Sequence, residues 1–191
     1  MTSFEYLSVA ISIVLGLGLA QVLGGLSAAA RSWKNVTPYW VHAVWVFLIL
    51  LLHIQTWWAI WDFSGDRTWT LVNFTGLLGF PVALYFMAHL VAPHVATDSS
   101  IDFRSYFAEI RIPFFVVLAF FWAYAIVFRT VAFGDPVLFE PRRVPQACLF
   151  FLAIAGTAKD SPRWQAAVLV TYLVVWTSLL GFRLALGAGL T

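Results

Sequence analysis

The sequence predicts an all-α integral membrane protein, a bundle of about six transmembrane helices with a short amphipathic surface helix between the third and the fourth. Three observations predict this fold class. Hydrophobic residues make up 62% of the 191 residues and charged residues only 10%, whereas soluble domains carry about 25% charged residues. Five stretches reach the roughly 20 apolar residues that a helix needs to cross the hydrocarbon core. Seven of the eight prolines lie at or beyond the ends of predicted spans, where a missing amide hydrogen costs least.

The predicted spans follow one another along a single domain, residues 1–191. The five long spans are 4–30, 39–61, 69–91, 112–133 and 164–188. The remaining span, 144–158, has 15 residues, or about 22 Å of helix at about 1.5 Å per residue. This length is short of a hydrocarbon core of about 30 Å. The third span contains Pro81 near its middle, which predicts a kink there.

The surface helix is predicted from the segment before the fourth long span. Phe103 and Phe107 recur there at helical spacing, with Arg104 and Glu109 between them. An apolar face opposed by charged side chains is typical of a helix that lies in the membrane interface.

The charges and tryptophans predict how the chain is oriented. With six spans and an outer N-terminus, the inner loops hold six basic residues and the outer loops three, as the positive-inside rule requires. Ten tryptophans, many near predicted span ends, fit the aromatic belts of a bilayer. Nine arginines against two lysines are typical of a GC-rich bacterial genome. We therefore expect a multi-pass protein of a bacterial inner membrane with a periplasmic N-terminus.

Small residues recur every fourth position along the first span and define what we call the small-residue face: Ser8, Ser12, Gly16, Ala20, Gly24 and Ala28. In lipid, where apolar contact alone does not drive association, such a face lets two helix backbones approach closely. The pattern predicts close packing, with a helix of the same chain favoured over a second copy or a foreign subunit.

Three histidines are the candidates for binding a ligand or cofactor. His42 and His53 lie eleven residues apart, and Trp57 continues their helix face. His42 and His89 are predicted at the same depth on neighbouring spans, which is the arrangement of an axial pair for haem b. His53 is a candidate of its own, because an ionisable residue well inside a span is functional by default.

Charged residues on four different spans are expected at similar outer depths: Glu5, Asp62, Arg129 and Arg183. They form a predicted outer charge cluster in which opposite charges pair and offset the cost of partial desolvation. The alternative is that both arginines extend independently to the lipid headgroups.

The sequence contains no motif that identifies an enzyme, and we assign no catalytic or metal-binding residues. A dispersed net charge of +2 excludes the clustered basic face of a nucleic-acid-binding protein. The favoured function is a non-catalytic accessory or assembly subunit, or an apolar-ligand-binding component, whose partners are the bilayer and another membrane subunit or a second copy. One alternative is an oligomeric channel or small-solute carrier lined by the kinked third span, His53 and the outer charges. Another is a b-type haem or quinone redox protein that uses His42 and His89.

Overall fold

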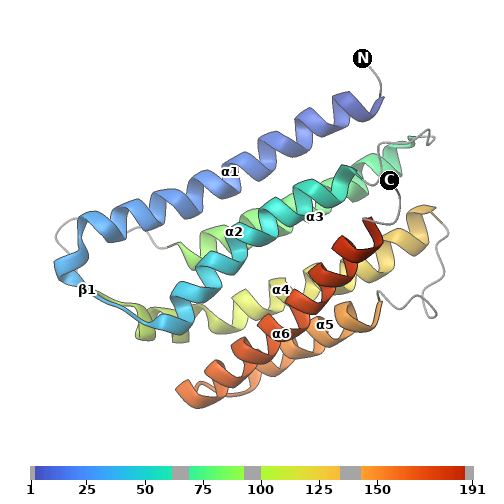
Figure 1. Cartoon of the computed structure of the whole chain (residues 1–191). Coiled ribbons are helices and arrows are strands. Elements are labelled where there is room, and N and C mark those ends of the chain that lie inside the picture. Colours follow the sequence, from blue (N-terminus) through green and yellow to red (C-terminus); the bar gives the residue numbers. More distant parts are fainter. Residues whose placement is uncertain (1–2, 62–68, 93–99, 134–142, 188–191) are drawn as a thin grey trace. The chain divides into compact units, whose positions relative to one another are not determined.

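The computed structural model describes residues 3–61, 69–92, 100–133 and 143–187, and it is almost entirely helical (Figure 1). Its α-helices are α1 (Ser3–Arg31), α2 (Trp40–Ile60), α3 (Leu71–Val91), α4 (Phe103–Phe133), α5 (Arg143–Ala158) and α6 (Pro162–Gly187). A short 3-10 helix, η1 (Trp33–Asn35), leads into the two-residue strand β1 (Val36–Thr37), and a second short strand, β2 (Ile101–Asp102), precedes α4.

The helices confirm the predicted fold class of an all-α integral membrane protein. Within the described residues, five helices are long and apolar enough to cross a bilayer, namely α1, α2, α3, α4 and α6. The shorter helix, α5, has 16 residues and coincides with the short predicted span. Large apolar side chains such as Ile13, Phe47 and Val116 are more than half exposed, which costs nothing where the solvent is lipid.

One predicted feature differs in the structure. Residues 103–111 are not a separate surface helix but the first turns of α4, which continues through Pro113. A proline inside a helix removes one backbone hydrogen bond. The continuous helix, however, buries both Phe107 and Phe114, with ring centroids 6.4 Å apart. The third predicted span is also one continuous helix, and α3 runs without a break through the buried Pro81; the kink expected there stays a prediction.

The chain divides into two compact units, Met1–Phe114 and Phe115–Thr191, and α4 contributes to both. In the first unit, α1, α2 and α3 pack against one another (Figure 1). Buried apolar residues on one side of α1, such as Leu7 and Ile11, form part of this core. Trp45 of α2 is fully buried edge-on to Phe114, with ring centroids 5.2 Å apart.

A parallel ladder joins two connecting segments of the first unit. Val36 pairs with Ile101 and Thr37 pairs with Asp102. The ladder therefore fixes the start of α2 beside the start of α4, and these helix ends meet the end of α3 at one end of the unit.

The second unit contains the rest of α4 together with α5 and α6, which pack on each other. Gly156 of α5 leaves room for the Phe115 ring of α4, which occupies the position that a Cβ would need. The buried Trp122 indole donates a hydrogen bond to the Tyr172 hydroxyl over 2.9 Å. Close packing at a glycine and one buried polar pair thus hold this unit together.

Candidate functional site: a cavity between α1 and α2

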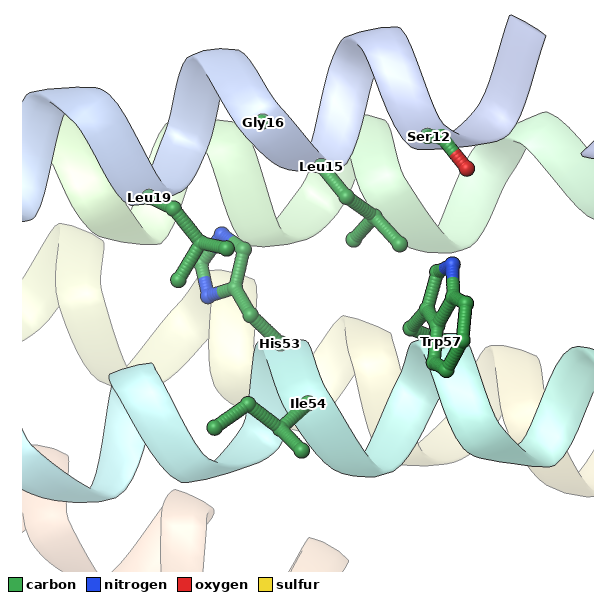
Figure 2. A pocket seen from close by; sticks show the side chains of 7 residues that line it. All are labelled: Ser12, Leu15, Gly16, Leu19, His53, Ile54 and Trp57. Carbon is green, nitrogen blue, oxygen red and sulfur yellow. The ribbon is translucent and has the colours of Figure 1, made fainter. Parts of the chain in front are cut away.

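A cavity of about 290 Å³ lies between α1 and α2 in the first unit (Figure 2). Four of its lining residues come from α1 and three from α2: Ser12, Leu15, Gly16, Leu19, His53, Ile54 and Trp57. Leu15 and His53 are buried, whereas Ser12, Gly16, Ile54 and Trp57 are exposed. The cavity is therefore an apolar groove that opens on the outer surface of the helix pair.

His53 forms one end of this cavity. Its ring extends from α2 to the backbone of α1 (Figure 2), and the residue is only 1% exposed. Its Nδ1 lies 2.7 Å from the Ile49 carbonyl oxygen, so we assign the proton to Nδ1 and the lone pair to Nε2. Within the described residues Nε2 has no hydrogen-bond partner.

The place of the His53 ring depends on a glycine of α1. A Cβ added at Gly18 would overlap His53 Nε2, so the ring fits only because this position has no side chain. The lone pair of Nε2 therefore faces the α1 backbone, and the edge of the ring, rather than Nε2, faces the cavity (Figure 2).

Two hydrogen-bond donors border the open part of the cavity, one on each helix. They are the Ser12 hydroxyl and the Trp57 indole N–H, and both lie toward the space between α1 and α2 (Figure 2). Ser8, one turn earlier, bonds to the Glu5 carbonyl over 2.8 Å. In the part of the chain that the structure describes, neither Ser12 nor Trp57 forms a hydrogen bond.

His42 has a structural role at the C-terminal end of α3. The last carbonyls of a helix lack partners within it, and here three consecutive ones are met by side chains of three other helices. The Tyr106 hydroxyl donates to the Leu90 carbonyl oxygen over 2.7 Å, and His42 Nε2 donates to that of Val91 over 2.9 Å. The Gln21 side-chain amide donates to the Ala92 carbonyl oxygen over 3.5 Å. Together these three bonds cap the C-terminal end of α3.

The predicted axial pair of His42 and His89 does not form in the structure. The His42 ring is buried, stacked on Phe103 with centroids 4.7 Å apart, and bonded to the Val91 carbonyl. His89 is exposed and packs on Tyr85 of its own helix, with centroids 4.4 Å apart. Matching depth along the helices did not determine which side of its helix each histidine occupies, and the structure buries His42 while it leaves His89 exposed.

The small-residue face is turned outward, contrary to the expectation that it packs within the chain. Four of its six members are exposed, and a Cβ at Gly16 or Gly24 would meet nothing within 4 Å. The close approaches of α1 instead use Gly18, against His53, and Gly25, where a Cβ would lie 2.7 Å from the Ala92 Cβ. These two glycines share the side of α1 that carries the buried leucines.

The predicted outer charge cluster stays a prediction. Asp62 lies outside the described residues, and at Arg183 only the backbone is described. Glu5 is exposed on α1 in the first unit, and Arg129 is half-buried on α4 in the second.

Arg143 counts among the three basic residues predicted for the outer loops, whereas the structure buries this cation. Arg143 is the first residue of α5 and only 6% exposed. Its Nη1 donates to the carbonyls of Ala125 and Ile126 on α4, over 3.2 Å in each case. Its position directly before the short apolar segment 144–158 was the only signal in the sequence.

Among the residues that the structure describes, no group of three or more His, Cys, Asp or Glu side chains is placed to hold a metal ion. Comparison with known proteins gives no guide to function, because no family, no characterised protein and no solved structure matches this chain.

Proposed function

We propose that this chain is a non-catalytic subunit that binds another transmembrane helix through the small-residue face of α1, as an accessory or assembly subunit of a membrane complex. The open backbone at Gly16 and Gly24 carries the proposal. Each has nothing within 4 Å of a Cβ position, so a partner helix could approach to backbone contact there.

The physical reason lies in the solvent. Lipid chains are as apolar as leucine, so helices associate in a bilayer through close van der Waals contact and interhelical hydrogen bonds, which small residues permit. The burial of α1 supports the proposal. Within the chain, 22% of the most apolar stretch of α1 is buried, compared with 44% for α2. A partner would cover a helix that the chain itself leaves largely uncovered.

Cysteine crosslinking in native membranes tests this proposal. In a Cys148→Ser background, Gly24→Cys should react with a short bismaleimide to give an adduct. An adduct of twice the chain mass identifies a second copy, and any other mass a foreign subunit. Gly181→Cys is the matched control, because Gly181 is also an exposed glycine with nothing within 4 Å. Equal adducts at both positions, or none at Gly24, would refute the proposal.

Filling the open backbone gives a second test. Gly24→Leu should abolish association and leave the unfolding of the isolated chain nearly unchanged, because a Cβ at this exposed position meets nothing within 4 Å. Gly181→Leu should leave association intact. Loss of folding in the Gly24 variant would contradict the outward placement of this face.

We also propose that the protein resides in a bacterial inner membrane with its N-terminus outside. Exposed basic residues lie near the ladder of β1 and β2, at what we call the ladder end of the first unit: Arg31, Lys34 and Arg104. The acidic residue Glu5 is exposed at the start of α1. This polarity supports an inner location of the ladder end. In intact cells, in the Cys148→Ser background, a membrane-impermeant maleimide should label Glu5→Cys and spare Lys34→Cys, and the reverse pattern would invert the topology.

A further inference from the structure

We infer that the cavity between α1 and α2 binds an apolar molecule through a carbonyl oxygen, which accepts hydrogen bonds from Ser12 and Trp57. The cavity shares Ser12 and Gly16 with the small-residue face, but the inference concerns hydrogen-bond donors within one copy of the chain and does not require a partner helix. An apolar cavity with a few convergent polar groups is the usual form of a small-molecule site.

The two donors determine the chemistry of the ligand. The indole N–H of Trp57 can only donate, and the Ser12 hydroxyl can donate as well. Polar groups that face lipid without a partner are costly, because the hydrocarbon offers no acceptor. Ser8 satisfies its hydroxyl on a backbone carbonyl of α1, as serines within helices commonly do. In the described part of the chain Ser12 does not, so its hydroxyl remains available to an acceptor that the ligand supplies.

The size and lining of the cavity limit the ligand further. About 290 Å³ is at the lower end of the usual range of about 300–1,000 Å³ for ligand pockets. It accommodates one ring or the first part of one lipid chain, but not a macrocycle such as haem. Leu15, Leu19 and Ile54 provide apolar contact for the body of such a molecule.

The depth of the cavity fits a carbonyl group near the membrane interface. Trp57 lies three residues before the end of α2 at Ile60, or about 5 Å of helix. Trp58 and Trp61, at 70% and 67% exposure, extend beyond it as an aromatic belt would. Two common sources place a carbonyl oxygen at this level: the ester of a glycerolipid and the head of a membrane quinone.

The test uses the full chain in nanodiscs and a benzoquinone that carries one isoprenoid unit and ¹³C-labelled carbonyls. A hydrogen bond lowers the carbonyl stretching frequency, so infrared difference spectra report the contact directly and titration gives the Kd. Ser12→Ala and Trp57→Phe should each remove the shifted band and weaken binding about fivefold, the value of one net hydrogen bond.

Matched controls remove the same chemical groups outside the cavity. Ser8→Ala deletes a hydroxyl that already has a partner, and Trp58→Phe deletes an exposed indole that does not line the cavity. Both should keep the shifted band and bind within about twofold of the wild type. Equal effects of cavity and control variants would overturn the inference.

Diester and diether lipids distinguish the two sources, because the ether lipid has no carbonyl oxygen. Quinone binding of equal strength in both nanodiscs identifies the quinone as the ligand. If the quinone binds more strongly in diether than in diester nanodiscs, the lipid ester competes with the quinone and is the occupant of the cavity. Absence of a shifted carbonyl band in both lipids would overturn the inference, whatever crosslinking shows about the partner helix.

Discussion

Two glycines of α1, two positions apart, lie in opposite surroundings. Gly18 faces the His53 ring so closely that a Cβ would overlap Nε2, whereas a Cβ at Gly16 would meet nothing within 4 Å. Gly18 is therefore required for packing within the chain, and Gly16 is free to contact something else. This difference follows from 200° of rotation along the helix, at 100° per residue.

Alanine substitution should separate these two roles. Gly18→Ala should lower the free energy of unfolding by about 1–3 kcal/mol, the usual cost of overpacking. Gly16→Ala should leave it unchanged or raise it by about 0.5–1 kcal/mol, because glycine inside a helix is entropically unfavourable. Reversible unfolding in mixed micelles measures both. Similar values for the two variants would contradict the placement of the His53 ring against Gly18.

At the scale of elements, each unit stabilises the end of one helix with side chains from elsewhere. Tyr106, His42 and Gln21 reach the last carbonyls of α3 in the first unit. In the second unit, Trp164 and Gln165 of α6 donate to the carbonyls of Ala155 and Gly156 on α5, over 2.9 and 3.0 Å. Helix ends that would otherwise expose unpaired carbonyls are thus fixed by tertiary contacts.

Removal of one hydroxyl tests the cap of α3. Tyr106→Phe keeps the ring and deletes the donor to Leu90, so the free energy of unfolding should fall by about 1 kcal/mol, as for other interhelical hydrogen bonds in membranes. Tyr85→Phe is the control, since Tyr85 contacts His89 through its ring. If the two variants were equally stable, the bond to Leu90 would contribute nothing measurable.

The start of α4 should depend on pH through Asp102. The Ser105 hydroxyl and the Arg104 amide hydrogen-bond its carboxylate, over 2.8 and 3.0 Å, and they hold the pKa of Asp102 below its ordinary value. Because the pKa of Asp102 is lower in the folded chain than in the unfolded chain, where it is about 3.9, the ionised carboxylate stabilises the fold at pH values above that unfolded pKa. This stabilisation is lost as the pH falls through the pKa of the folded chain. The difference in thermal midpoint between wild type and Asp102→Ala should shrink on acidification, and a constant difference would argue against the cap.

Hydropathy predicted where helices lie along the chain, but not which way their side chains point. The predicted span 39–61 and the observed α2 (Trp40–Ile60) differ by one residue at each end. The depth of His42 and His89 was inferred from the same pattern, yet their directions depend on contacts with Val91 and Tyr85. Apolar residues surround each span, so the sequence contains little periodicity from which a buried face could be inferred.

The whole molecule should match a bilayer of ordinary thickness. α2 and α3 have 21 residues each, or about 32 Å of helix, close to a hydrocarbon core of about 30 Å. Trp40 and Trp58, which are both exposed, mark the two ends of α2. Length and aromatic positions therefore agree on where the interfaces lie.

Stability in bilayers of graded thickness tests this match. The thermal midpoint in nanodiscs should be highest for lipids with a hydrocarbon core of about 30 Å and should fall in thinner and thicker ones, because mismatch must be relieved by tilt or lipid deformation. A midpoint that rises steadily with chain length would indicate that the helices extend further into the hydrocarbon than the tryptophans suggest.

The spacing of the small-residue face also determines how a partner must cross α1. Four residues on a helix of 3.6 per turn advance the face by 40° at each step, so the face winds obliquely around the helix. Ridges formed by every fourth residue interlock at about −50°, and close membrane pairs of this kind cross right-handed at about −40°. At such an angle two helices separate within a few turns. A partner centred on Ala20 would touch Gly16 and Gly24 and leave Ser8 and Ala28 to the lipid.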